Sequence, residues 1–178
     1  MCDRRILFLD YDVVLHPDAA YLVKRRPVLR ADGALFMWAQ YLIDVLDCHP
    51  DVQIVLSTSW VRELRFSRAR SFLPERLQTR VVGATWHSGM RCSEDLRPLG
   101  RTTWWDRASR YEQIKRYVDR AGLSTWLAID DQPDEWSQED LHHLLRTDSM
   151  KGLSDSGVRS LLENWLAAAQ PCVRPPSA

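Results

Sequence analysis

The chain has 178 residues with 24 basic and 24 acidic side chains, so its formal net charge at pH 7 is zero. At roughly 150 residues per domain, this length allows one domain with a complete core and excludes a multidomain enzyme. The composition, 45% hydrophobic and 27% charged, is that of a globular protein and excludes general disorder. A neutral chain also lacks the strong positive field of a protein that coats nucleic acid, so its partners must be inferred from a site.

The sequence pattern fits neither a membrane-spanning segment nor a signal peptide. The apolar stretches are short and interrupted by charges, and the first residues, MCDRRILFLD, do not form a signal peptide. We therefore expect a cytoplasmic protein without a membrane partner. We also expect a single domain over residues 1–170 and a disordered tail over residues 171–178, whose sequence is PCVRPPSA. The sequence does not indicate the oligomeric state.

Strands and helices are predicted to alternate along the chain. Continuous apolar runs indicate strands that are buried on both faces, whereas apolar residues at helical spacing indicate amphipathic helices. In chain order we predict a strand at 5–9, a helix at 33–49, a strand at 52–56, helix and connector at 60–78, a strand at 79–82, a helix from 106 to 121, strands at 126–129 and 144–146, and a final helix with Ser154 as its N-cap. This alternation predicts an α/β fold, a three-layer Rossmann-like sandwich with a mostly parallel central sheet.

Polar side chains follow three of the predicted strands, and they are Asp10, Asp12, Ser57, Thr58, Asp130 and Asp131. The carboxyl ends of parallel strands share one edge of an open α/β sheet, and this edge is where ligands bind. Four carboxylates at one edge repel each other unless a cation neutralises them. Oxygen ligands from aspartate favour Mg2+, which commonly takes a substrate phosphate as a further ligand. The pattern therefore indicates metal-assisted phosphate chemistry.

The spacing of Asp10 and Asp12 lets two carboxylates reach the same space, so that one attacks the substrate while the other moves protons. A hydroxyl residue at the neighbouring strand end can donate to phosphate oxygens, and a cation can offset the charge of the transferred group. The candidates for this cation are Arg107, Arg110 and Lys115.

Three segments resemble the motifs of the haloacid dehalogenase (HAD)-like phosphohydrolases. The segment ILFLDYDVVL resembles the first motif, VLSTS the second and LAIDDQPDEW the fourth, and they occur in the same order. More narrowly, DYDVVLHP, LSTSW and IDD with a late GLS resemble the capless HAD domain related to Swiss army knife RNA-repair proteins. The resemblance covers about residues 5–166. It implies a HAD-like fold without a large cap domain and the activity of a phosphoric monoester hydrolase.

The resemblance also implies roles for the four acidic residues. Asp10 is expected to be the nucleophile and a metal ligand. Asp12 is expected to be the general acid and base, with its backbone carbonyl on the metal. Asp130 is expected to be the main acidic metal ligand, with Asp131 assisting it. The implied cofactor is Mg2+, and the implied intermediate is an aspartyl-phosphate.

The phosphate-binding residues are less sharply defined. The resemblance assigns Thr58 to the phosphate, with Ser57 as the alternative because periodicity does not fix the end of a strand to one residue. The family usually has a lysine in its third motif, whereas the matching position here is Arg110. Lys115 and Arg107 remain alternatives for this cation. An arginine neutralises phosphate as a planar fork rather than as a mobile point charge.

The segments that follow the first and third predicted strands are too short to form a globular cap. The site should therefore be open, and open capless sites in this superfamily are associated with large substrates such as nucleic-acid ends. Two basic stretches, KRRPVLR and RELRFSRAR, follow the first two motifs. They are interpreted as a rim that tracks phosphates, or alternatively as a solvated surface.

Two other functions stay open. A metal-dependent PIN-like nuclease also begins with a strand and an aspartate, and Asp44 or Asp47 could supply its second acid. The chain could also be a catalytically silent HAD-like binding module. Among residues near the motifs, His16 is interpreted as a turn residue rather than a base. Trp60 and Trp136 are either stacking surfaces or packing residues.

Overall fold

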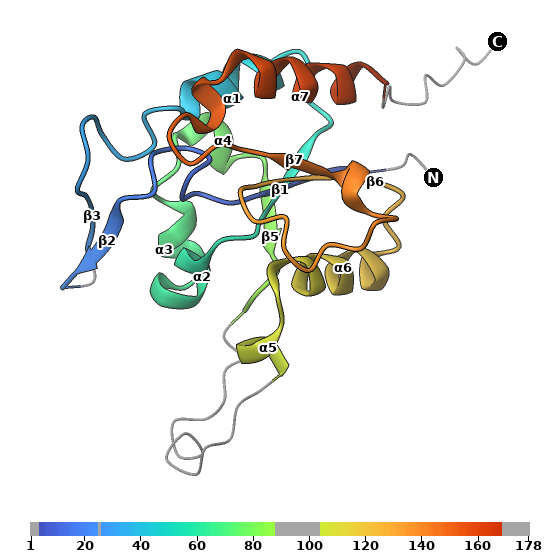
Figure 1. Ribbon diagram of the computed structural model, residues 1–178, viewed down its shortest axis with the longest axis horizontal. Helices are drawn as coiled ribbons and strands as arrows, with labels where there is room; N and C mark the ends of the chain where they lie inside the picture. Colours follow the sequence, from blue (N-terminus) through green and yellow to red (C-terminus); the bar gives the residue numbers. More distant parts are fainter. Residues whose placement is uncertain (1–3, 25, 88–103, 169–178) are drawn as a thin grey trace.

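The computed structural model describes residues 4–24, 26–87 and 104–168, and its centre is a five-stranded parallel sheet (Figure 1). The expected tail at 171–178 lies outside the described residues. In spatial order the strands are β5 (Val81–Ala84), β4 (Gln53–Leu56), β1 (Arg5–Leu9), β6 (Thr125–Asp130) and β7 (Leu144–Arg146).

Helices cover both faces of this sheet (Figure 1). One face packs against α1 and α7, and the other packs against α6. The helices are α1 (Ala39–Leu46), α2 (Ser59–Leu64), α3 (Phe66–Arg70), α4 (Glu75–Gln78), α5 (Trp104–Arg107), α6 (Arg110–Ala121) and α7 (Ser156–Ala168), with short 3-10 helices at Leu141–His143 and Gly152–Ser154. The prediction of a three-layer α/β sandwich is confirmed, and the described residues contain no large cap. No helix in the described ranges has the length and apolar character needed to cross a membrane.

The central strand β1 shows why the apolar run predicted a strand correctly. Its side chains alternate between the two layers of helices: Ile6 and Phe8 lie in the core beneath α6, and Leu7 and Leu9 lie in the core beneath α1 and α7. All four side chains are buried. A strand buried on both faces needs an unbroken apolar run, and Asp10 ends this run at the edge of the sheet.

Local capping signals fix both ends of α6. The Ser109 hydroxyl accepts a hydrogen bond from the Glu112 backbone N–H, and the Glu112 carboxylate accepts one from the Ser109 N–H, which is a complete capping box. At the other end Gly122 adopts a left-handed conformation with φ of 61°. Arg110 is therefore the first residue of the helix, at the edge of the sheet where β1 ends.

The first helix is shorter than the predicted range 33–49. Gly33 and Phe36 have positive φ angles of 107° and 61°, which a right-handed helix does not allow. The Trp38 N–H donates to the Leu15 carbonyl at 3.0 Å, so this segment is anchored to the loop after β1. The helix begins only at Ala39. The predicted helix was too long because apolar residues at helical spacing also occur in this preceding segment, which packs on the core without being helical.

The sequence analysis missed an antiparallel hairpin, β2 (Ala20–Val23) and β3 (Arg26–Leu29), which extends from the body at the blue end of the chain in Figure 1. Its apolar side chains are exposed on successive positions, including Tyr21, Leu22 and Val23. Without a buried face, neither the period of a strand nor that of a helix is visible.

Two smaller differences concern element ends. The third strand of the sheet is β5 at Val81–Ala84 rather than 79–82. Ser154 is not the N-cap of the last helix, because it lies in a 3-10 helix and its hydroxyl donates to the Lys151 carbonyl at 2.6 Å. The carboxylate of Asp155 instead accepts the Gly157 N–H at 2.7 Å. Residues 144–146 form a strand as predicted, and β6 extends the predicted 126–129 by one residue at each end.

We predict that Gly152→Ala destabilises the fold strongly, because Gly152 has φ of 46° and its added Cβ would lie 2.4 Å from the Val13 carbonyl oxygen and 2.4 Å from the Trp38 ring. The left-handed conformation and the overpacking together should cost about 3 kcal/mol. Gly122→Ala is the matched control, since Gly122 has φ of 61° but nothing within 4 Å of the added Cβ. It should cost only about 1 kcal/mol. Urea unfolding measures both, and equal losses would contradict this account of Gly152.

Candidate active site

Three parallel strands end side by side at the polar edge of the sheet. The ladder continues one residue past β1 and β4, since the Asp10 N–H donates to the Ile129 carbonyl at 3.2 Å and the Ser57 N–H donates to the Leu9 carbonyl at 2.9 Å. The predicted acids and hydroxyls therefore leave the sheet at the same level. The backbone of the sheet, rather than a flexible loop, holds the first residue of each motif.

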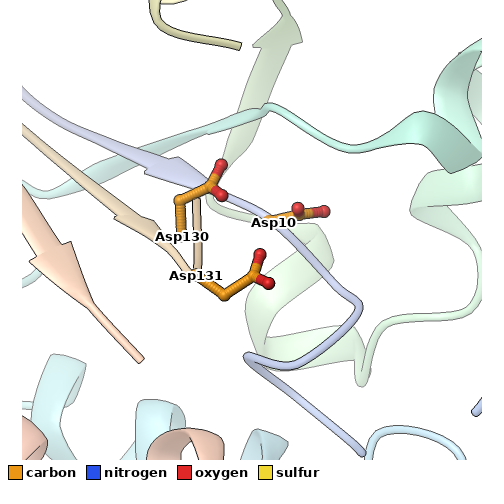
Figure 2. Close-up of side chains that lie close together, drawn as sticks. All are labelled: Asp10, Asp130 and Asp131. Atoms are coloured by element: carbon orange, nitrogen blue, oxygen red, sulfur yellow. The ribbon is translucent and has the colours of Figure 1, made fainter. Parts of the chain in front are cut away.

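Three carboxylates converge there, those of Asp10, Asp130 and Asp131 (Figure 2). One oxygen from each lies within 4.8 Å of the others. Asp10 is 4% exposed and Asp130 is 1% exposed, so water solvates neither carboxylate well. Backbone N–H groups bind one oxygen of each: Tyr11 donates to Asp10 at 2.7 Å, and Gln132 donates to Asp130 at 3.0 Å.

This burial changes the acidity of both groups. Burial raises the pKa of the Asp10 carboxyl to about 6, against the opposing effect of Arg110, and repulsion from Asp12 adds to the rise. Burial and repulsion from Asp10 raise the pKa of Asp130 to about 7, again against Arg110. Both values exceed the ordinary aspartate value of about 3.9. When all the carboxylates of the site are ionised, their negative charge must be balanced by nearby positive charge.

Arg110 supplies part of the positive charge that balances these carboxylates. Its guanidinium lies 3.1 Å from Asp10 Oδ2 and 3.3 Å from Asp130 Oδ2, and it donates a further hydrogen bond to the Ser57 carbonyl. Lys115 instead pairs with Asp119 and Asp140, each at 3.4 Å. Of the cations considered from the sequence, Arg110 is the one that the structure places among the acids.

The three acids fit a hard divalent cation. Asp130 Oδ2 is buried and accepts no hydrogen bond from the described residues, which leaves a lone pair available to a ligand. An all-oxygen set of carboxylates is the donor chemistry that Mg2+ prefers. The Asp12 carboxylate is not a member of this group. The expectation that the Asp12 backbone carbonyl binds the metal stays a prediction.

The two hydroxyl candidates differ in their contacts. The Thr58 side chain hydrogen-bonds Asp10, and its oxygen also accepts the Trp60 N–H at 3.4 Å. The Ser57 hydroxyl is buried and has no hydrogen-bond partner among the described residues, while the Ser57 carbonyl binds Arg110. Thr58 is therefore the hydroxyl in direct contact with the acidic centre.

Two aromatic side chains hold Asp12, and the sequence analysis did not assign them to it. Trp60 Nε1 lies 3.0 Å from Asp12 Oδ2, and His16 Nε2 lies 3.1 Å from Asp12 Oδ1. His16 directly follows the turn at 13–15, close to its interpretation as a turn residue, and it is fully buried. Trp60 and Trp136 are 6% and 7% exposed, so of the two interpretations left open for these rings the structure supports packing. The sequence signal that could have linked His16 to Asp12 is their separation of only four residues.

The nuclease alternative loses its second acid. Asp44 lies on α1, exposed, and accepts a hydrogen bond from Gln40 at 2.7 Å. Asp47 follows α1, pairs with Arg76 at 2.5 Å, and lines a cavity with the residues that precede and begin β4. That cavity is at the amino end of β4, whereas Asp10 is at the carboxyl edge of the sheet. A PIN-like pairing of Asp10 with Asp47 is therefore not formed.

In a comparison with protein families, residues 6–158 match the model of the HAD domain in Swiss Army Knife RNA repair proteins. Comparisons with curated proteins and with solved structures gave no match. The matched range contains β1, β4 and β6 with the acids, hydroxyls and arginine at their ends. The chain therefore belongs to the family of HAD domains in Swiss Army Knife RNA repair proteins, and with it to the HAD-like phosphohydrolases.

Proposed function

We propose that this chain is a Mg2+-dependent phosphatase that works through an aspartyl-phosphate on Asp10, with phosphorylated nucleic-acid ends as its substrate. The observation that carries the proposal is the position of the Asp10 carboxylate. It lies 3.1 Å from the Arg110 guanidinium, within 4.8 Å of carboxylate oxygens of Asp130 and Asp131, and two residues before a second carboxylate, Asp12. Family membership and geometry support the same chemistry.

Asp10 acts as the nucleophile. Its carboxylate oxygen attacks phosphorus, the bond between phosphorus and the leaving oxygen breaks, and the departing oxygen takes a proton from Asp12. In the second half Asp12 accepts a proton from water, and this water attacks phosphorus and releases Asp10 as a free carboxylate. Nucleophilic attack and proton transfer need separate residues, because Asp10 is bonded to phosphorus between the two half-reactions and cannot move protons during that time.

Arg110 and Thr58 bind the phosphoryl group. The guanidinium has a fixed planar fork that matches phosphate oxygens, and its charge offsets that of the transferred group. The Thr58 hydroxyl, already in contact with Asp10, donates to a phosphoryl oxygen. Ser57 contributes its carbonyl, which accepts a hydrogen bond from Arg110 and helps to orient the guanidinium.

Asp10, Asp130, Asp131 and the Asp12 carbonyl would hold Mg2+. When bound, this ion neutralises the acidic cluster and polarises a phosphoryl oxygen. Asp130 is fixed by β6 and by the Gln132 N–H on Oδ1, so Oδ2, which accepts no hydrogen bond from the described residues and lies 3.3 Å from Arg110, is oriented before any ion binds. Asp131 is partly exposed and completes the set from the solvent side.

The proposed substrate class is supported by the family and by the lack of a large cap among the described residues. The segment between β1 and α1 forms a hairpin rather than a globular cap. A site without a cap does not need to enclose its substrate, so a phosphate at the end of a large molecule can reach it. The family description names RNA repair proteins, and this context supports nucleic-acid ends as the large molecules that carry the phosphate.

The direct test is phosphate release from an aryl phosphate and from oligonucleotides with a 3′- or a 5′-phosphate, with Mg2+ or with EDTA. Asp10→Asn should abolish release, because an amide is not a nucleophile toward phosphorus. Asp119→Asn is the control, since this exposed acid lies on α6 and pairs with Lys115. Cleavage of the oligonucleotide chain without phosphate release would contradict the proposal and favour a nuclease.

We predict that Arg110→Ala lowers kcat by roughly 100-fold or more, the loss typical of a deleted electrostatic group at a reaction centre. Lys115→Ala should leave kcat within about twofold, because Lys115 pairs with acids outside the site and screened exposed pairs contribute little. Steady-state kinetics on the aryl phosphate measure both variants. Equal losses would show that Lys115, rather than Arg110 alone, serves the reaction.

We predict that Mg2+ raises the Tm more at pH 8 than at pH 5. The pKa values of Asp10 and Asp130 are about 6 and about 7 in the folded chain, above their unfolded values. Without Mg2+, the protonated pair therefore stabilises the fold most below about pH 4. This contribution to stability is lost as the pH rises through 6 and 7. Mg2+ binds the ionised pair without displacing protons at pH 8, whereas at pH 5 it must displace them.

Thermal unfolding with and without Mg2+ at both pH values checks this prediction. Asp130→Asn should lose most of the Mg2+-dependent rise in Tm, and Asp119→Asn should keep it. An equal rise in Tm at pH 5 and at pH 8 would show that the buried pair is not where the ion binds.

A further inference from the structure

The Asp12 carboxylate is bound from its inner side by two buried N–H groups. The indole N–H of Trp60 lies 3.0 Å from Oδ2 and 3.2 Å from Oδ1, and His16 Nε2 lies 3.1 Å from Oδ1. His16 is fully buried and Trp60 is 6% exposed, whereas the Asp12 side chain is 27% exposed. Of these three side chains, the Asp12 carboxylate is the one that a substrate can reach.

The hydrogen bonds of His16 define its tautomer. The Phe36 backbone N–H donates to Nδ1 at 3.5 Å, so Nδ1 is the acceptor and Nε2 carries the proton that faces Asp12. Phe36 holds this position with φ of 61°, a left-handed conformation that is unfavourable for a bulky residue. Strain at the residue whose N–H orients the imidazole indicates that this orientation matters.

Aromatic packing and a backbone bond fix the Trp60 ring. Its neighbours are Tyr11, Phe36 and Phe72, with ring centroids at 5.5, 5.4 and 5.6 Å and nearly perpendicular planes. The Trp60 backbone N–H donates to the Thr58 hydroxyl at 3.4 Å, which joins the indole to the residue in contact with Asp10. The indole N–H therefore has one orientation, toward Asp12.

We propose that Trp60 and His16 are positioning residues that hold the Asp12 carboxylate for proton transfer to the leaving group. This inference rests on the proposed function, in which Asp12 gives its proton to the departing oxygen as the phosphorus–oxygen bond breaks. The proton transfer leaves a negative carboxylate on Asp12. The two N–H groups donate to that carboxylate, so they stabilise the charge that develops there and restrict its rotation.

The test uses the dependence of the rate on the leaving group. A para-nitrophenolate ion departs without a proton, whereas the alkoxide of an alkyl phosphate such as glycerol phosphate needs one. Trp60→Phe keeps the aromatic packing and removes the N–H. It should lower kcat about tenfold or more on the alkyl phosphate and less than about threefold on para-nitrophenyl phosphate, with KM little changed. Asp12→Asn should change the ratio of the two kcat values in the same direction as Trp60→Phe, and by a larger factor.

Two matched comparisons separate positioning from packing. Trp136 is equally buried, and its indole N–H has no hydrogen-bond partner among the described residues, so Trp136→Phe removes an N–H that holds nothing. It should leave the ratio of the two rates unchanged. His16→Gln keeps a side-chain N–H that can reach Asp12, whereas His16→Leu does not. The Gln variant should recover most of the alkyl phosphate rate that the Leu variant loses.

The outcomes separate this inference from the function on which it rests. If wild-type protein releases phosphate in an Asp10-dependent manner and Trp60→Phe, folded by circular dichroism, loses rate equally on both substrates, the positioning role is overturned while the proposed function stands. If wild-type protein shows no Asp10-dependent release from any of the substrates, the proposed function is overturned and this inference with it. A selective loss on the alkyl phosphate in Trp60→Phe, absent in Trp136→Phe, establishes the role.

Discussion

The repulsion between two buried carboxylates, those of Asp10 and Asp130, is the interaction on which the rest of the site depends. The parallel pairing of β1 with β6, in which Leu9 faces Ile129, brings the two acids together, and neither can move away without breaking the sheet. Burial raises the pKa of both groups, so ionisation of the pair requires positive charge nearby. The sheet thereby creates an electrostatic demand that a helix from another part of the chain, α6, meets with its first side chain, Arg110.

The choice of arginine at this position has a structural consequence. One guanidinium reaches an oxygen of Asp10, an oxygen of Asp130 and the Ser57 carbonyl, so it joins the ends of β1, β6 and β4. The single nitrogen of a lysine lacks this planar, branched reach. The guanidinium also stays ionised when buried, which a lysine in the same place would do less readily. Arg110 is thus a cross-link among three strand ends as well as a source of charge.

The sequence predicted the parts of this site that depend on strand ends and missed those that depend on tertiary packing. The ends of β1, β4 and β6 were predictable because double burial requires apolar runs, and their acids meet because parallel strands share an edge. Arg110 was chosen from the resemblance, and Ser109 and Glu112, the two residues of its capping box, give a second, local reason to prefer it over Lys115 because they mark the helix start. The bond between Trp60 and Asp12 spans 48 residues and depends on how an aromatic cluster packs, which no local pattern encodes.

The exposure of the two motif-one carboxylates suits a phosphatase for large substrates. The Asp10 side chain is 6% exposed and the Asp12 side chain is 27% exposed, although only one residue separates them. In the proposed mechanism, a phosphoryl group bonded to Asp10 would lie inside the protein, and an oxygen that takes a proton from Asp12 would lie at the surface. The bond that breaks would then cross the boundary of the protein, with the leaving group outside. Under this arrangement the size of the leaving group does not limit its access, so specificity must come from surface contacts beyond the phosphate.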